Sequence, residues 1–464
     1  MLPLLPLIIL IPFLSTLPLF MLDERYAPKI SAIVSLISLV LVVVSVALYM
    51  YGHQDLSFNI PYLPFTNASV GFVLTQAGAI LLLMTAIVFF AAGLVGEYFV
   101  GNERIYWFTF LLSEGSALAV FTSSNLFLLY VFWEIAEVMM FFIIYRYGGY
   151  EKKYAAVKFI VYSLFSSLLF LLGIFMLYSY ITPHTFSIST IEANSSTIPL
   201  GLQTEILLLL LTSFMIKIPI FPFHTWLPDA HTEAPTTGSM ILAGVLLKFG
   251  GYGLILTFYM LPMATHYAIY IAAIFIFSSV YSAVVSLRQI NLKRAIAYTS
   301  VTDMGIVALG IATGGKLGIT GALYAMLSHG LAIAMLFLIA GTLNEAYGTL
   351  YINKIKGVIL NFRPLAYLFI LGSLATIGMP FTAGFIGDIL IFISSFASFG
   401  AIGLIPLAGI ILIGAMLFWI IERVFLGGKG TRTQRNVPDV ITYVSVFLLA
   451  STILFGVLPM LLIR

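Results

Sequence analysis

Eight ionisable side chains lie inside long apolar stretches of the sequence. They are Glu114, Glu134, Glu137, Lys217, Lys248, Asp303, His329 and Asp388. Each would cost roughly 2.5–3.5 kcal/mol at the centre of a membrane helix. We therefore expect them to be paired, hydrated or neutral. Ion pairs that merely hold helices together would explain one or two of them, whereas a pathway for protons or cations explains the whole row.

The acidic pair and the two lysines are of types that can exchange protons. Glu134 and Glu137 lie three positions apart, so they share one face of a helix, and their like charges disfavour ionisation of both. An acidic partner such as Glu134 would keep Lys217 protonated. Withdrawal of that partner would release the proton toward a neighbouring group such as Lys248.

The remaining side chains complete a candidate relay. His329 can exchange protons near neutral pH, although a single membrane histidine can also be a satisfied core residue. Asp303 and Asp388 could pass protons or bind Na⁺. For Asp303, a hydrogen bond that only packs two helices together is the alternative.

Two prolines interrupt the apolar stretches near these groups. Pro219 follows Lys217 by two residues, and Pro380 closes a Gly-Met-Pro sequence two turns before Asp388. A proline lacks the backbone donor, and a break inside a bilayer persists only where protein or water satisfies the freed carbonyls. Two broken helices five spans apart predict two five-helix repeats, which must be inverted because five is odd.

The composition requires a membrane around these elements. Of 464 residues, 61% are hydrophobic and 8% are charged, whereas soluble domains carry roughly 25% charged residues. Soluble enzymes and nucleic-acid binders are therefore excluded. The chain has no cysteine, so it offers no thiolate metal site or iron–sulfur cluster. We expect no cofactor and no metal in this chain, and no ATP hydrolysis, because no phosphate-binding loop is present.

Apolar runs of about 20 residues, long enough to cross a bilayer, recur along the chain. They predict an all-α polytopic membrane protein with about fourteen spans, near 3–22, 30–50, 71–95, 104–121, 125–145, 154–181, 203–222, 237–258, 266–286, 294–313, 318–343, 365–396, 401–422 and 438–462. We expect four parts: helices 1–3 in 1–103, the first repeat in 104–258, the second repeat in 266–422, and the last helix in 423–464.

The basic residues are distributed unevenly between the two sets of loops. One set holds nearly all of them, including Lys153, Lys158, Lys293 and Arg294. By the positive-inside rule, these loops face the cytoplasm or its equivalent, and both termini lie on the opposite side. The membrane is then a prokaryotic cell membrane or an energy-transducing organelle membrane.

One long segment resembles a known family. It runs Lys217-Ile-Pro-Ile-Phe-Pro-Phe-His224-Thr-Trp-Leu-Pro-Asp229-Ala-His231-Thr-Glu233-Ala-Pro235 and continues to Lys248. This segment resembles the signature of the antiporter-like membrane subunits of respiratory complex I and of the related Mrp antiporters. Further motifs follow in the family's order over about residues 70–425: Phe-Trp-Glu134, Leu292–Ser300, Ser328-His329-Gly330 and Phe385-Ile-Gly-Asp388. The acidic residue near 388 and the His-Thr-Glu-Ala-Pro-Thr motif are closer to subunit M, or chain 4, than to subunits L and N.

The resemblance implies roles for individual residues. It matches Glu134 and Lys217 to an ion pair, Lys248 to the central relay lysine, His329 to the relay histidine, Asp388 to the acidic residue of the exit half-channel, and Glu114 to a supporting carboxylate. Two positions depart from the pattern. Asp303 stands where the resemblance predicts histidine. Asp388 stands where it predicts glutamate, whose side chain is one methylene longer, and a water could bridge that difference.

Two further histidines lie in the signature segment. His224 and His231 are seven positions apart, which is not a zinc-ligand spacing. We expect them to order the turn at the helix break or to line the path by which protons enter.

The resemblance therefore implies a proton-translocating subunit of a complex I-type quinone oxidoreductase. Electron transfer from NADH, ferredoxin or F420H₂ in other subunits would drive it. Its expected partners are further antiporter-like subunits, quinone-site subunits and the lipid bilayer, with no nucleic acid. The alternative is a subunit of an Mrp-type or membrane-bound hydrogenase Na⁺/H⁺ antiporter. A purely structural scaffold is disfavoured by the buried charges.

Overall fold

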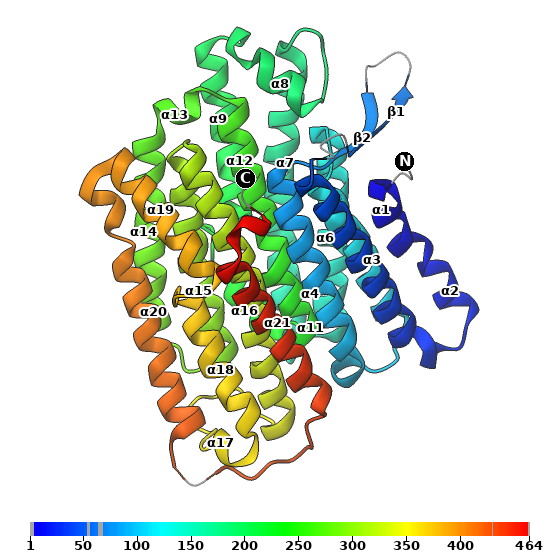
Figure 1. The fold of residues 1–464 in the computed structure, drawn as a ribbon, viewed down its shortest axis with the longest axis vertical. Helices are drawn as coiled ribbons and strands as arrows, with labels where there is room; N and C mark the ends of the chain where they lie inside the picture. The colour runs from blue at the N-terminus through cyan, green and yellow to red at the C-terminus, as the bar shows by residue number, and fades with distance from the viewer. Residues whose placement is uncertain (1–3, 53–55, 64–67, 429, 463–464) are drawn as a thin grey trace.

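Long apolar helices run side by side through most of the chain (Figure 1). The computed structural model describes residues 4–52, 56–63, 68–428 and 430–462. The start of α1 and the last helical turn both lie toward the end of the bundle that carries the β-hairpin (Figure 1). An even number of membrane crossings produces this arrangement of the two ends.

The N-terminal part combines helices with one short hairpin. Its elements are α1 (Leu4–Leu14), α2 (Thr16–Met21), α3 (Ala27–Met50), β1 (Ser57–Leu63), β2 (Ala68–Val73) and α4 (Gln76–Val100). β1 and β2 pair antiparallel, with Ser57 opposite Val73. The hydropathy pattern did not predict this hairpin, and the span expected at 71–95 begins inside β2, whereas α4 begins at Gln76.

The next part contains the first broken helix. Its elements are α5 (Arg104–Val120), α6 (Leu126–Tyr147), α7 (Lys152–Tyr180), α8 (Ile188–Asn194), α9 (Leu200–Lys217), α10 (Trp226–Glu233), α11 (Thr236–Ile241), the π-helical turn η3 (Leu242–Leu246) and α12 (Leu247–Met260). The gap between α9 and α10 contains Pro219.

The last part contains the second broken helix. Its elements are α13 (Met263–His266), α14 (Ala268–Ser286), α15 (Leu292–Ala312), α16 (Lys316–Tyr347), α17 (Val358–Asn361), α18 (Arg363–Thr376), α19 (Ala383–Phe399), α20 (Leu407–Ile420), the π-helical turn η5 (Ile421–Leu426) and α21 (Asp439–Val457). Pro380 lies in the gap between α18 and α19.

The all-α membrane fold expected from the sequence is confirmed. Within the described residues, 13 helical segments are long and apolar enough to cross a membrane. The expected span at 104–121 corresponds to α5, which has 17 residues. The expected span at 365–396 is divided into α18 and α19. The inverted relation of the two repeats and the four-part division of the chain stay predictions.

Four segments form the centre of the bundle. The most apolar windows of Thr236–Met260 and Lys316–Tyr347 are 100% buried, and those of Leu292–Ala312 and Gln76–Val100 are 94% and 89% buried. By contrast, the window of Glu24–Met50 is only 39% buried. Lys248, Asp303 and His329 therefore lie on the helices that are most shielded from lipid.

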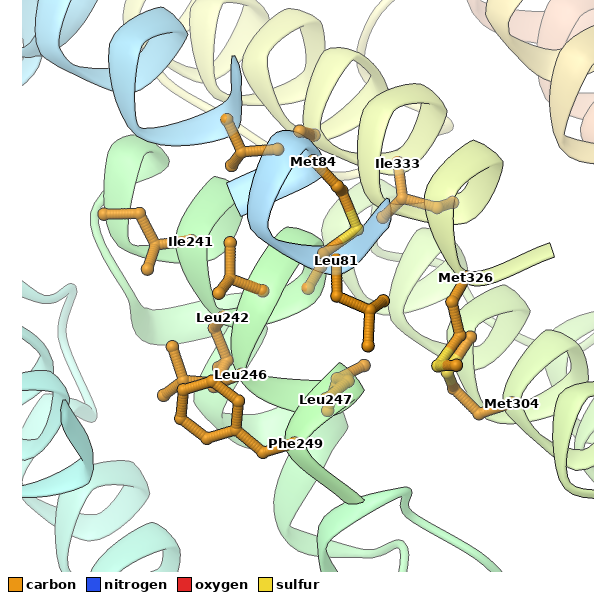
Figure 2. Close-up of a cluster of buried hydrophobic side chains, with 14 of the residues drawn as sticks. Leu81, Met84, Ile241, Leu242, Leu246, Leu247, Phe249, Met304, Met326 and Ile333 are labelled. Atoms are coloured by element: carbon orange, nitrogen blue, oxygen red, sulfur yellow. The ribbon is translucent and has the colours of Figure 1, made fainter. Parts of the chain in front are cut away.

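An apolar cluster fills the space between these central helices. Figure 2 shows Leu81 and Met84 of α4 close to Ile333 of α16 and to the π-helical turn η3. Gly244 of η3 and Gly330 of α16 meet backbone to backbone, because a Cβ on Gly330 would lie 2.9 Å from the carbonyl oxygen of Gly244. Small residues allow this close approach of membrane helices. The approach brings His329 next to the helix that carries Lys248.

Candidate functional site: a buried polar axis

Lys217 lies at the end of α9, where the helix breaks. Its Nζ donates to both carboxylate oxygens of Glu137 on α6, and both side chains are only 4% exposed. Trp133 Nε1 also donates to Glu137 Oε1, at 2.7 Å. The helix ends here because Pro219 has no backbone donor and disfavours a helical conformation in the residue before it. Trp226 Nε1 donates to the carbonyl of Ile216 at 3.0 Å and satisfies one of the freed groups.

The acidic partner of Lys217 differs from the expected one. The ion pair is formed by Glu137 rather than Glu134, and Glu134 instead accepts a hydrogen bond from Ser167 of α7. Residues three apart on a helix point about 60° away from each other. The rotation of α6 therefore directs Glu137 toward α9 and Glu134 toward α7. Both carboxylates still lie beside the row of ionisable groups that we call the polar axis, which consists of Lys217, Lys248, His329, Asp303 and Asp388.

Lys248 lies at the centre of the bundle with 0% exposure. Its Nζ contacts the carbonyl oxygen of Ala243 at 2.5 Å and Nδ1 of His329 at 2.7 Å. Ala243 belongs to the π-helical turn η3, and such turns within α-helices occur frequently at functional sites. The first of these contacts lies within one helix, and the second joins α12 to α16.

His329 continues the axis toward α15 and α19. Its Nε2 lies 4.0 Å from Asp303 Oδ2. A cavity of about 20 Å³ lies beside these two groups, and its lining residues are Asp303, Val307, Ala325, Ser328, His329, Thr376, Gly384 and Asp388. The structure thus brings together three of the ionisable groups singled out from the sequence.

Asp388 is held by the break between α18 and α19. Gly378 in this break has φ +71°, a conformation that favours glycine. A Cβ at Gly378 would lie 2.5 Å from Asp388 Oδ2. The glycine is therefore needed both for the turn and for the position of the carboxylate.

The helices that carry the two lysines, α9 and α12, pack against each other. A Cβ at Gly250, two residues after Lys248 on α12, would lie 3.0 Å from Lys217 Cβ. The end of α9 therefore packs against α12 near its relay lysine. Among the described side chains, no hydrogen bond directly connects Lys217 with Lys248.

Three predicted residues lie apart from the hydrogen-bonded groups of the axis. Glu114 on α5 is fully buried, and its Oε2 accepts from Ser35 Oγ of α3 at 2.7 Å. His224 lies in the break after α9, and its ring meets Tyr281 edge-on at 5.6 Å. His231 on α10 stacks on Phe337 at 4.5 Å. No group of three His, Asp or Glu side chains in the described part of the chain is arranged to hold a metal ion.

A cluster of charges beneath the first break was not predicted. Asp229 of α10 pairs with Lys158 at 2.7 Å and with Arg294 at 2.9 Å. Lys293 is only 4% exposed and donates to the carbonyl of Ala234 at 2.8 Å. The sequence analysis counted these three basic residues with the loops, whereas the structure places Lys158 within α7 and Lys293 and Arg294 in the first turn of α15. Trp133 was also missed, although its spacing of four from Glu137 puts both residues on one helix face.

Comparison with known proteins identifies the family. The model described as "NADH:quinone oxidoreductase/Mrp antiporter, TM" matches residues 123–417. The chain is 36% identical to NADH-quinone oxidoreductase subunit M of Rickettsia prowazekii, over 99% of this chain and 96% of that protein. It is 39% identical to subunit M of Rickettsia bellii, over 79% and 75% of the two chains.

Solved structures share the fold. Respiratory complex I from Thermus thermophilus with bound NADH contains a chain that matches with a TM-score of 0.89 at 24% identity, covering 98% of this chain and 96% of that one. A chain of the Mrp complex from Dietzia sp. DQ12-45-1b matches with a TM-score of 0.90 at 17% identity, covering 99% and 96%. Together with the family model and the subunit M relatives, the motifs that follow one another from Phe-Trp-Glu134 to Asp388 show that the chain belongs to the NADH:quinone oxidoreductase/Mrp antiporter family and is an antiporter-like subunit of the subunit M type.

Proposed function

We propose that this chain translocates protons as a membrane subunit of a complex I-type quinone oxidoreductase. Electron transfer from NADH, ferredoxin or F420H₂ to quinone in other subunits supplies the energy. The relationship to subunit M over nearly the whole chain supports this role. The observation that carries it is the contact between Lys248 and His329, at 2.7 Å, on the two central segments whose most apolar windows are fully buried.

The Lys217 pair is the point at which the relay responds to other subunits. While the ammonium of Lys217 stays bound to Glu137, the positive charge is neutralised inside the membrane. A movement of α6 that draws Glu137 away leaves this charge unpaired, at a high cost in free energy. Lys217 then loses its proton to the axis. Glu134, held by Ser167, is the second carboxylate that α6 can present to it.

The central part of the relay passes the proton from α12 to α16. Lys248 donates to Nδ1 of His329, and the imidazole has a second nitrogen that faces Asp303. An imidazole that accepts at one nitrogen and donates at the other is suited to proton transfer. Asp388, at the second helix break, completes the path from Lys217 through Lys248 and His329.

The chain itself holds no redox centre in this proposal. It has no cysteine with which to bind an iron–sulfur cluster, and the electrons move through partner subunits. The loops rich in lysine and arginine face the cytoplasm or its equivalent, and both termini face the opposite side.

Purified complex in sealed vesicles tests the proposal. Proton uptake is followed with a pH-sensitive dye in sodium-free buffer, for wild type, Lys217→Ala and the control Lys153→Ala, which alters an exposed lysine. We expect wild type and Lys153→Ala to pump and Lys217→Ala to lose coupled pumping. Full pumping by Lys217→Ala would overturn the relay. A sodium requirement in wild type would point instead to an Mrp-type or hydrogenase-linked Na⁺/H⁺ antiporter subunit.

A further inference from the structure

An open groove runs between α7 and α9 on the outer surface of the bundle. Its volume is about 470 Å³, which is in the range of small-ligand sites. α7 lines it with Phe165, Leu169 and Met176, and α9 lines it with leucines between Glu205 and Thr212. The most apolar window of α7 is only 39% buried, so the groove opens toward the surrounding lipid.

The groove covers one half of the bilayer in depth. α7 has 29 residues, and its midpoint is Ser166. Ser166 Oγ donates to the carbonyl of Ser213 at 2.9 Å, which fixes the same level on α9. The groove begins at this level, beside Phe165, and reaches Met176, ten residues beyond the midpoint of α7. At 1.5 Å per residue this distance is about 15 Å, the hydrocarbon depth of one leaflet.

A carboxylate lies at the outer end of the groove. Glu205 is exposed and lines the groove together with Met176, at the level where the hydrocarbon meets the headgroups. Among the described residues, no ion pair includes Glu205. α7 ends and α9 begins toward the hairpin end of the bundle (Figure 1), where lysines and arginines are few. A cation bound by Glu205 therefore comes from outside the chain.

The depth and the charge of the groove favour a lipid over a protein partner. A membrane helix of a partner packs across about 30 Å of hydrocarbon, whereas no lining residue of this groove lies on the half of α7 before Phe165. A lipid that lays one acyl chain in the groove places its headgroup at Glu205. An ammonium headgroup supplies a positive charge and three N–H donors for the carboxylate, and an anionic headgroup is repelled by it.

We propose that this groove binds a phospholipid with a primary amine headgroup, such as ethanolamine. One acyl chain lies along Phe165, Leu169 and Leu209, and the ammonium donates to the carboxylate of Glu205. The phosphate of the headgroup stays in water at the membrane surface. The site shares no residue with the polar axis, so the proposal stands independently of proton translocation.

Photo-crosslinking of the whole complex in vesicles tests the headgroup. The probe is phosphatidylethanolamine with a diazirine in its acyl chain, and mass spectrometry maps its adducts on residues 165–176 and 205–212. Unlabelled phosphatidylethanolamine, phosphatidylcholine and phosphatidylglycerol compete with the probe. In wild type, we expect phosphatidylethanolamine to compete about fivefold better than phosphatidylcholine, because choline has no N–H donor. This ratio corresponds to an exposed charge pair of about 1 kcal/mol.

Substitution of the carboxylate removes this preference. In Glu205→Gln, we expect phosphatidylethanolamine and phosphatidylcholine to compete equally at the mapped segments. The matched control is Glu192→Gln, which alters an exposed glutamate of α8 and should keep the fivefold ratio.

Substitutions of leucine test the groove itself. Leu209→Trp fills the groove and should lower the yield of adducts on both segments. Leu172→Trp places the same side chain at a position of α7 that is 55% exposed and outside the lining, so its yield should equal that of wild type.

Three results would overturn the proposal. Equal competition by phosphatidylethanolamine and phosphatidylcholine in wild type, or an unchanged ratio in Glu205→Gln, would exclude the amine headgroup. Adducts that appear on another subunit and not on residues 165–176 or 205–212 would show that a partner helix covers the groove. Should Leu209→Trp reduce assembly, the competition in Glu205→Gln decides the matter, since that substitution alters only an exposed side chain.

Discussion

At the scale of single residues, the choice of acidic partner for Lys217 is the main finding. Glu137 binds the ammonium and also accepts from Trp133, while Glu134 bonds only to the hydroxyl of Ser167 among the described side chains. The two carboxylates therefore differ in their partners. Glu137 neutralises the buried charge, and we propose that Glu134, one helical turn away, is the carboxylate that can replace it.

This division predicts different effects of two matched substitutions. Glu137→Gln leaves the ammonium of Lys217 buried without a counter-charge, which should cost roughly 3–5 kcal/mol. Glu134→Gln removes no ion pair and should cost less. The thermal midpoint of the purified complex measures the difference, and Glu137→Gln should have the lower value. Equal midpoints for the two variants would contradict the assignment of Glu137 as the partner.

The sequence identified these side chains but not their contacts. Charged residues inside apolar runs are visible in any hydropathy pattern, so the eight groups of the apolar stretches could be named, whereas the buried Lys293 was not. The partner of Lys217 depends on the rotation of α6, which is set by the packing of Trp133 and its neighbours. The cavity between Asp303, His329 and Asp388 joins four helices, and such a space follows only from tertiary packing.

At the scale of elements, two helix breaks and a π-helical turn position the axis. Lys217 ends α9, the turn η3 precedes Lys248, and the break between α18 and α19 holds Asp388 against Gly378. The prolines that mark both breaks are visible in the sequence. The π-helical turn and the β-hairpin were not predicted, because neither leaves a periodic hydrophobic signal of its own.

The break at Gly378 gives a second prediction. Gly378→Ala places a methyl group against Asp388 Oδ2 and forces a side chain into a left-handed conformation, a strain of order 1–3 kcal/mol. Gly400→Ala is the matched control, because Gly400 also has a positive φ but a Cβ there would meet no atom within 4 Å. We expect Gly378→Ala to lose proton pumping while Gly400→Ala keeps it, measured in sealed vesicles at equal amounts of assembled complex. Equal pumping by both variants would show that the position of Asp388 is unimportant.

At the scale of the whole molecule, the bundle shields its polar groups with other helices. Lys248, Asp303 and His329 lie on the central segments, and the outer helices expose large apolar side chains. Both described ends of the chain lie toward the hairpin end (Figure 1). This arrangement agrees with an even number of crossings, and the uneven distribution of basic residues predicts which end faces the cytoplasm.

The absence of cysteine makes this orientation easy to test. Lys153→Cys introduces the only thiol of the chain into a loop predicted to be cytoplasmic, and Ser196→Cys introduces it on the opposite side; both positions are exposed. In vesicles with the cytoplasmic face outward, a membrane-impermeant maleimide should label Cys at 153 and not at 196. The reverse pattern would invert the predicted topology.

The most direct test of the central claim is the number of protons moved per electron transferred by wild type and by Lys248→Ala in sealed vesicles. Lys248 is fully buried and contacts His329, and the end of α9 that carries Lys217 packs against α12, so the proposed relay has no route that avoids Lys248. We predict that Lys248→Ala lowers the ratio while electron transfer continues when the vesicles are uncoupled. An unchanged ratio in Lys248→Ala would contradict a relay through the central lysine.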